Sequence, residues 1–262
     1  MLDYFLSRFN SFSLETNGLT PENLSARSKR EFSYSPNSDI LIIGMPAWGQ
    51  SITKWKQVKK FAEKSGLSFL VYEFPCEILS NDYALTEKIF SKIDEIVRKD
   101  IKELKNKYKF KRCVIIGISL SSSYGSMIYK ENFNITDIVL VCPGNNLALN
   151  VWEGCRTQHF RKSYEKQGIN SLQLKEYWGK LASENNMPAP DTNITIVYGT
   201  YDKIIPYYQS KALADTLKSN GLKIDTIRFK LGHYLTSAYF LLFPDKTMDK
   251  VLQLTKNKIS VI

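Results

Sequence analysis

Histidine is scarce in this chain: only two of the 262 residues, His159 and His233, are of this type. The four cysteines show no C-x-x-C spacing, and neither histidine has a plausible ligand partner nearby in the sequence. Structural metal sites are usually built from such clusters. We therefore expect no metal site. Cys142, at the end of a predicted strand, suits a small apolar filler of the core.

The sequence also lacks any apolar run close to the roughly 20 residues that a membrane-spanning helix needs. Its first ten residues, MLDYFLSRFN, carry Asp3 and Arg8 within a short apolar segment, which argues against a secretory signal. We therefore expect no integral membrane segment. The lack of a secretory signal and of paired cysteine spacing together predict a reduced, cytoplasmic protein.

Dense tracts of lysine and arginine are missing as well, although the chain is basic, with a formal net charge of +10. The lysines are spread over the whole length, many of them interleaved with glutamates on predicted helical faces. There is no zinc-finger or RNA-binding signature. This pattern predicts a solvated basic surface and no nucleic-acid partner. A weak contact with an anionic surface stays open, and the pattern says nothing of the oligomeric state.

What the chain has in abundance is short, apolar, β-rich runs that alternate with segments of helical periodicity. The predicted strands cover 31–35, 39–44, 67–74, 113–116, 136–141, 194–198 and 224–229. The predicted helices cover 2–10, 51–64, 82–104, the segment that follows 121, 206–217 and a last one from about 247. This alternation predicts an α/β fold with a mostly parallel central sheet flanked by helices. Residues 145–190 show no strand pattern and hold several aromatic residues among helix formers.

One short string stands out at the end of a predicted central strand. Gly117-Ile118-Ser119-Leu120-Ser121 follows the apolar run at 113–116 and precedes a segment that can become helical. A serine between two small residues at a strand-to-helix turn is typical of a nucleophile elbow. Such a string is also common in ordinary turns. The interpretation therefore depends on whether the chain supplies partners for the serine.

A serine hydroxyl is a poor nucleophile at neutral pH, so it needs a base, and the base needs a group that orients it. His233 follows the last predicted strand, and Asp202 follows the strand before it. In a parallel sheet, the carboxyl ends of the strands lie at one edge. We therefore expect Ser119, Asp202, His233 and the 45–50 loop to converge there.

Three motifs are now in place: the elbow at 117–121, a Gly-x-x-Asp-x-x-x-Pro turn at 199–206, and Gly232-His233. Over roughly residues 37–245 the sequence resembles the α/β-hydrolase family, of the esterase or lipase type. The resemblance implies Ser119 as the nucleophile, His233 as the general base and Asp202 as the acid that orients it. It also implies a single domain over 1–262, with 145–190 as a helical cap, and a reaction that requires no cofactor.

An acyl-transfer serine needs amide donors for the developing oxyanion. In this family one donor is normally the amide after the nucleophile, here Leu120. The second would come from the loop after the first central strand, and by register we expect the Trp48 amide, with Ala47 next. This loop lacks the His-Gly that is common in the family. The acid of some members follows the earlier strand, where this chain has Asn145 and Asn146, so Asp202 is favoured.

For the pocket, residue type predicts a partly apolar surface built from Met45, Ala47, Trp152 and His159, although for His159 the favoured interpretation is a packed or surface histidine. The predicted function is hydrolysis of an ester-type bond in a small acyl ester, through an acyl-enzyme on Ser119. A thioesterase, an amidase or peptidase and an acyltransferase remain alternatives on the same triad. A non-catalytic scaffold that binds a ligand or a partner is the alternative from a different class.

Overall fold

The computed structural model describes residues 18–127, 133–248 and 251. The short helix predicted at 2–10 lies outside the described residues. Of the last predicted helix, residues 245–248 and 251 are described and are helical. Among the helices in the described ranges, none combines the length and the apolar character needed to cross a bilayer.

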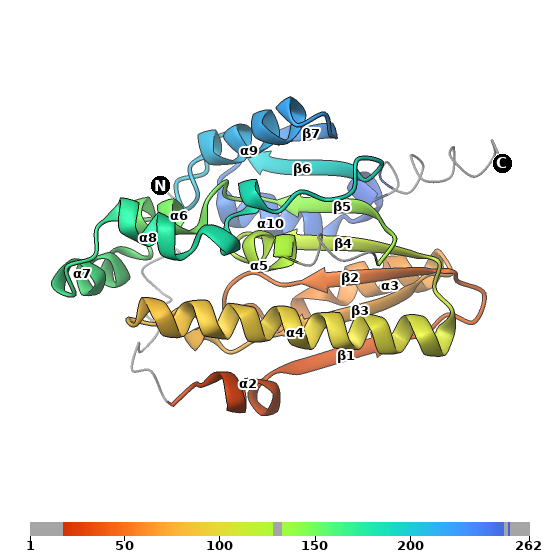
Figure 1. Ribbon diagram of the computed structural model, residues 1–262. Helices are drawn as coiled ribbons and strands as arrows, with labels where there is room; N and C mark the ends of the chain where they lie inside the picture. Colours follow the sequence, from red (N-terminus) through yellow and green to blue (C-terminus); the bar gives the residue numbers. More distant parts are fainter. Residues whose placement is uncertain (1–17, 128–132, 249–250, 252–262) are drawn as a thin grey trace.

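Within the described residues, seven strands form one sheet in the order β1-β3-β2-β4-β5-β6-β7 (Figure 1). The first strand is antiparallel to its neighbour, and the other pairings in this sheet are parallel. The predicted mostly parallel sheet is therefore confirmed. The strands are β1 (Lys29–Ser33), β2 (Ile40–Met45), β3 (Ser68–Glu73), β4 (Arg112–Ile118), β5 (Ile135–Val141), β6 (Asn193–Gly199) and β7 (Lys223–Phe229).

The central strands are buried on both faces, which explains why their sequences are continuous apolar runs. Every residue of β2 and of β6 is buried, whereas the edge strand β7 is partly exposed along its length. Parallel strands covered by helices on both sides show this pattern because neither face meets water. The two faces of the sheet therefore support two separate apolar cores.

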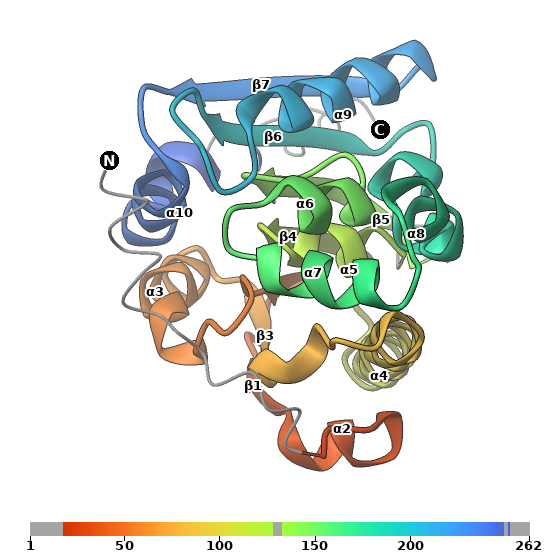
Figure 2. The ribbon, with the colours of Figure 1, turned by 90° about the vertical axis from the view of Figure 1, so that its left-hand side faces the viewer.

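Two groups of helices cover the two faces (Figure 2). Helices α3 (Lys56–Lys64) and α10 (His233–Leu242) pack on one face, through residues such as Phe61 and Phe240. Helices α4 (Tyr83–Tyr108) and α9 (Tyr207–Ser219) pack on the other, through residues such as Ile93 and Leu213. The sheet is thus enclosed between helical layers, as predicted.

The longest helix, α4, has Asp82 as its N-cap residue, which agrees with the predicted start at 82. The Asp82 carboxylate accepts hydrogen bonds from the amides of Ala84 and Leu85, which satisfies two donors of the first turn. The helix ends at Tyr108, and the C-cap residue Lys109 adopts the left-handed conformation with φ of 59°. Its C-terminal end therefore lies four residues beyond residue 104, where the apolar periodicity ended.

Other elements differ from the prediction. Residues 21–27, where no helix was predicted, form helix α2 (Pro21–Arg27) behind a Thr20 capping box. The predicted helix at 51–64 starts as a 3₁₀ turn (Ile52–Trp55), because the Glu73 carboxylate accepts the Ile52 amide and the Ser51 hydroxyl. Helix α10 was not predicted, because its sequence is almost uniformly apolar and shows little amphipathic periodicity.

Residues 145–190 are helical, and this fully described range contains no strand. They form α6 (Leu147–Glu153), α7 (Gln158–Lys166), α8 (Ser171–Tyr177) and two 3₁₀ turns (Gly179–Leu181 and Ser183–Asn185). Figure 1 shows α6, α7 and α8 at the end of the sheet toward which the parallel strands point. The Tyr164 hydroxyl donates to the Ser80 carbonyl at 2.6 Å, which ties this segment to the start of α4.

Candidate active site

Ser119 lies on a strained turn between β4 and α5, whose described part is Ser121–Met127. Its φ is +57°, a left-handed conformation that is costly for a residue with a Cβ atom. A hydrogen bond to the neighbouring strand β5 stabilises this turn: the Ser119 amide donates to the Val141 carbonyl at 2.8 Å. Backbone strain that the surrounding structure maintains is typical of functional residues, so it supports Ser119 as a functional residue at the carboxyl edge of the sheet.

The two small residues that flank Ser119 in this turn have different roles. A Cβ atom on Gly117 would lie 3.3 Å from the Ser122 Cα atom, so there is little room for a larger residue. The Ser121 hydroxyl is 2.6 Å from the Met45 carbonyl and accepts the Ile118 amide at 2.6 Å. A serine at 121, where glycine is common in the family it resembles, thus ties the elbow to the end of β2.

Asp202 lies on the turn after β6, and its position depends on Gly199. A Cβ atom on Gly199 would approach the Leu231 carbonyl to 2.2 Å, so only glycine lets this turn pack against the segment before His233. One carboxylate oxygen of Asp202 accepts the amides of Ile204 and Ile205, at 2.9 and 3.0 Å. The other oxygen is thereby aimed at the neighbouring turn.

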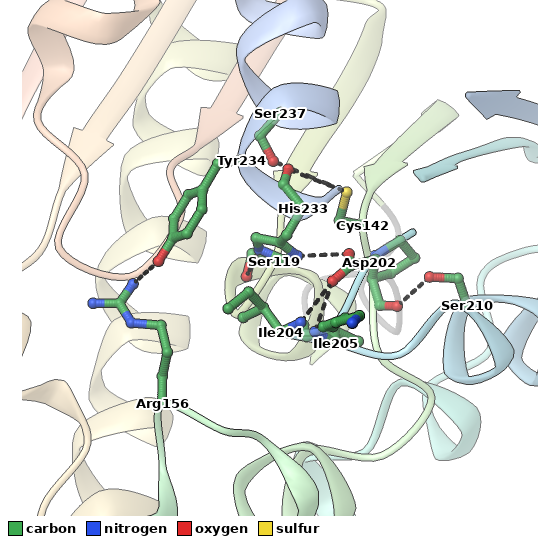
Figure 3. Close-up of polar contacts among 12 residues, drawn as sticks. Ser119, Cys142, Arg156, Asp202, Ile204, Ile205, Ser210, His233, Tyr234 and Ser237 are labelled. Atoms are coloured by element: carbon green, nitrogen blue, oxygen red, sulfur yellow. Dashed lines mark hydrogen bonds and ion pairs between the residues drawn. The ribbon is translucent and has the colours of Figure 1, made fainter. Parts of the chain in front are cut away.

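His233 is the first residue of α10 rather than a loop residue, and it joins the other two side chains (Figure 3). Its Nδ1 donates to the second Asp202 oxygen at 2.7 Å, because an ionised carboxylate can only accept. In the neutral ring, Nε2 is then the acceptor, and the Ser119 hydroxyl donates to it at 2.9 Å. The three predicted residues therefore form one continuous chain of hydrogen bonds, in which each side chain is at least nine-tenths buried.

The environment of His233 shifts its protonation equilibrium. Burial lowers the pKa of the imidazole, but the charge of Asp202 and the hydrogen bond to it act in the opposite direction and raise the pKa of His233 above its ordinary value of 6.5. The pair therefore stabilises the imidazolium, which is the form that a histidine takes after accepting a proton from a serine.

Cys142 is a neighbour of the triad that the sequence did not indicate. It follows β5 in a left-handed conformation, with φ of +50°, and its thiol lies 3.8 Å from the His233 carbonyl. Burial raises the pKa of this thiol. Its sulfur, the Asp202 carboxylate and the His233 ring nitrogen lie within 4.8 Å of one another. A metal ion there would require Nδ1 to lose the proton that it donates to Asp202, so the arrangement fits a histidine oriented by a carboxylate better.

The oxyanion of the tetrahedral intermediate needs two amide donors, and three backbone amides are candidates: those of Leu120, Ala47 and Trp48. In the part of the chain that the structure describes, the Leu120 amide donates to no acceptor. The Ala47 amide, by contrast, donates to the Gln50 side-chain oxygen at 3.2 Å. The sequence indicated Trp48 ahead of Ala47 as the second donor, and that order stays a prediction. Leu120, Ala47 and Trp48 all line the same cavity as Ser119.

That cavity measures about 570 Å³, and Ser119 and His233 form part of its wall. Of the predicted pocket residues, only Ala47 lines it. Met45 is fully buried beneath the elbow. Trp152 lies under the Arg161 guanidinium, 5.2 Å from the ring centre. His159 packs on Phe160 at 4.0 Å. The prediction that these three residues line the pocket is therefore wrong for this cavity.

The wall residues that the sequence did not indicate include Asn150, Arg156 and Tyr234. Asn150 and Arg156 come from α6 and the turn after it, and Tyr234 comes from α10, directly after His233. No local motif marks them, because their common feature is only that they face one cavity. The single local signal was the position of Tyr234 beside the predicted general base.

The position of the predicted alternative acid is occupied by amides. The side chains of Asn145 and Asn146 both donate to the Glu184 carboxylate, at 2.7 and 2.9 Å. They hold one of the 3₁₀ turns of the 145–190 segment against the end of β5. They offer His233 no carboxylate, which agrees with the choice of Asp202 from the sequence.

Several solved structures share the fold of this chain. The esterase Pf2001 of Pyrococcus furiosus superposes with a TM-score of 0.61 at 16% sequence identity, covering 92% of this chain and 94% of its own. The mouse alpha/beta hydrolase domain-containing protein 10 gives a TM-score of 0.58 at 16% identity, covering 87% and 94%. A thermophilic esterase of Thermogutta terrifontis, in a butyrate-bound structure, gives 0.56 at 15% identity, covering 89% and 88%. No protein-family model and no curated protein sequence matches the chain.

These likenesses extend over most of each chain and agree with the strand order and the parallel pairing described above. The chain therefore has the α/β-hydrolase fold. At identities below a fifth, the likeness speaks for the architecture, and the chemistry must be argued from the residues of the site themselves.

Proposed function

We propose that this protein is a serine hydrolase that cleaves carboxylic esters through an acyl-enzyme on Ser119. The observation that carries the proposal is the unbroken hydrogen-bond chain from Ser119 through His233 to Asp202, at the wall of a cavity large enough for a small acyl ester. The names of two of the similar structures, both esterases, support ester cleavage over other acyl transfers.

In the proposed mechanism, the Ser119 hydroxyl attacks the ester carbonyl and passes its proton to His233 Nε2. Asp202 holds Nδ1–H and stabilises the imidazolium. The amides of Leu120 and Trp48 stabilise the tetrahedral oxyanion. The imidazolium then protonates the leaving alcohol, and a water molecule, deprotonated by the same nitrogen, attacks the acyl-enzyme. The second collapse returns Ser119 and releases the acid.

A fluorophosphonate probe tests the nucleophile directly. We expect it to phosphonylate Ser119 and no other serine of the folded protein, because only this hydroxyl donates to a histidine nitrogen in the described chain. Mass spectrometry of the digested adduct locates the modified residue. Prior unfolding in denaturant should abolish the labelling. A well-folded protein that leaves Ser119 unlabelled would rule out both the nucleophile and the hydrolase, and would leave the non-catalytic scaffold.

The same site could act on a thioester or an amide, or transfer the acyl group to an acceptor other than water. Matched p-nitrophenyl ester, thioester and p-nitroanilide substrates with one acyl chain separate the first three reactions. We expect the ester to be cleaved with the highest kcat/KM among substrates of similar leaving-group reactivity. An added alcohol acceptor that diverts most of the acyl group from water would instead indicate a transferase.

The pH dependence of kcat/KM follows from the shifted pKa of His233. Only the neutral ring can accept the Ser119 proton, and a raised pKa keeps the ring protonated to higher pH. We therefore expect the rate to rise with pH, with the midpoint of the ascending limb above 6.5. Initial rates with an uncharged ester over the range in which the fold is intact measure this limb. A midpoint below 6.5 would contradict a dominant influence of Asp202.

A further inference from the structure

The wall of the cavity has an uneven distribution of charge. Among the described residues that line it, Lys54 and Arg156 carry positive charges, and no aspartate or glutamate is present. The Asp202 carboxylate belongs to the triad, but it lies behind His233 and does not reach the cavity surface. A ligand in this cavity therefore meets two cations among otherwise mainly apolar or neutral side chains.

The Arg156 guanidinium lies at the wall of the cavity that Ser119 and His233 also line, and two aromatic side chains hold it there. It donates to the Tyr234 hydroxyl at 2.5 Å (Figure 3), and Tyr234 follows His233 directly in α10. It also lies 5.6 Å from the centre of the Trp48 ring and 5.8 Å from that of Tyr234. Aromatic faces orient a guanidinium without neutralising its charge. Arg156 therefore bridges the histidine side and the oxyanion-loop side of the cavity.

Asn150 adds a polar group to the same wall. Its side-chain amide packs directly on the backbone of Gly144, where a Cβ atom would lie 1.6 Å from the amide nitrogen. Its amide oxygen is buried and, within the described residues, accepts no hydrogen bond. Because the two ends of an asparagine amide exchange places on rotation, the group can offer a ligand either a donor or an acceptor.

We propose that the ester cleaved at Ser119 carries a carboxylate, bound by Arg156 with Asn150 as a further hydrogen-bond donor and Lys54 adding positive charge. The inference rests on the proposed ester hydrolysis and specifies its substrate class. A planar guanidinium matches the two oxygens of a carboxylate, and such charge-assisted pairs are stronger than neutral hydrogen bonds. Because the cavity has no acidic wall residue, nothing on the described wall repels such a group.

The alternative is that Arg156 has a purely structural role and only joins the turn after α6 to α10 through Tyr234. A structural role would affect charged and neutral esters alike. Recognition of a carboxylate would affect only the charged one. The ratio of kcat/KM between matched anionic and neutral esters therefore separates the two roles.

Two pairs of esters place the carboxylate on either side of the scissile bond. The first pair is mono-4-nitrophenyl glutarate and its methyl ester, with the charge in the acyl half. The second is 4-acetoxybenzoate and its methyl ester, with the charge in the alcohol half. In one pair we expect the anion to be preferred by about tenfold or more in kcat/KM, as charge-assisted hydrogen bonds typically provide.

Three variants are compared with the wild type in that pair. Arg156→Gln should bring the ratio of kcat/KM between the anionic and the neutral ester close to one. Arg156→Lys should retain part of this ratio, because an ammonium keeps the positive charge but lacks the planar pair of donors of a guanidinium. Arg161→Gln is the matched control, since Arg161 lies on α7 and pairs with Glu165 away from the cavity wall. It removes the same charge from the protein and should leave the wild-type ratio.

An equal ratio in the wild type and in Arg156→Gln, for both pairs, would overturn the inference. So would an equal loss in Arg161→Gln, since that would reflect net charge alone. If none of the four esters shows turnover that depends on Ser119, the proposed function fails instead. Calorimetric titration of Ser119→Ala with the same four esters then tests the anion site. Tighter binding of the carboxylates than of their methyl esters, lost when Arg156→Gln is added, would support the site. Equal affinity for the carboxylates and their methyl esters would refute it.

Discussion

Replacing Ser119 by alanine is expected to lower kcat/KM for ester hydrolysis by a factor on the order of 10⁵, because the triad acts as a unit and fails without its nucleophile. This loss corresponds to about 7 kcal/mol of transition-state stabilisation. The residual rate would come from binding and from the oxyanion amides alone. Steady-state kinetics on p-nitrophenyl esters, with enzyme concentration raised for the variant, measure the loss.

The matched control is Ser122→Ala, which removes a serine hydroxyl from the same buried turn. The Ser122 hydroxyl donates to the Ser119 carbonyl at 2.7 Å and does not touch His233. We expect this variant to keep most of the activity and to lose about 1 kcal/mol of stability. Thermal unfolding of both variants separates loss of chemistry from loss of fold. Comparable activity in Ser119→Ala and the wild type would contradict the proposed mechanism.

Asp202→Asn is expected to lower kcat by a factor on the order of 10⁴ while preserving the fold. The side-chain oxygen that accepts the amides of Ile204 and Ile205 can remain in place. The group that replaces the other oxygen is an amide nitrogen, which donates to His233 Nδ1. This favours the tautomer that carries its proton on Nε2, where it can no longer accept the Ser119 proton.

The pH profile gives a second reading of the same variant. Asp202 supplies the largest influences that raise the pKa of His233, so without its carboxylate burial should dominate and the midpoint of the ascending limb should move to lower pH than in the wild type. Asp215→Asn, an exposed position on α9, is the matched control and should change neither kcat nor the midpoint. If Asp202→Asn kept the wild-type kcat, another residue would have to be the acid that orients His233.

Local sequence was sufficient for most of the elements but not for their ends. The β-rich runs at 39–44 and 194–198 became β2 and β6 because both are continuously apolar and bounded by turn residues. Helix α10 was missed because a helix buried on most sides loses the polar face that makes its period visible. Helix α2 was missed because seven residues after a turn signal carry too little periodicity.

The three triad residues could be named from the sequence because each sits in a motif whose backbone demands are local. A left-handed turn needs small neighbours at 117 and 121, and the turn after β6 needs Gly199. The parallel strand order could then place all three at one edge. The pocket residues had no such support. Met45 was assigned to the wall from its residue type, yet its side chain is fully buried beneath the elbow.

The sequence by itself determined the architecture and the three candidate triad residues, because hydrophobic periodicity and turn chemistry are encoded within a few neighbouring positions. Only the tertiary structure decided what surrounds them: Cys142 behind His233, the Ser121 bond to β2, and Arg156 between Trp48 and Tyr234. These contacts join segments 76–108 residues apart in the chain. Which side chains face one cavity depends on the packing of whole helices, and no local pattern records it.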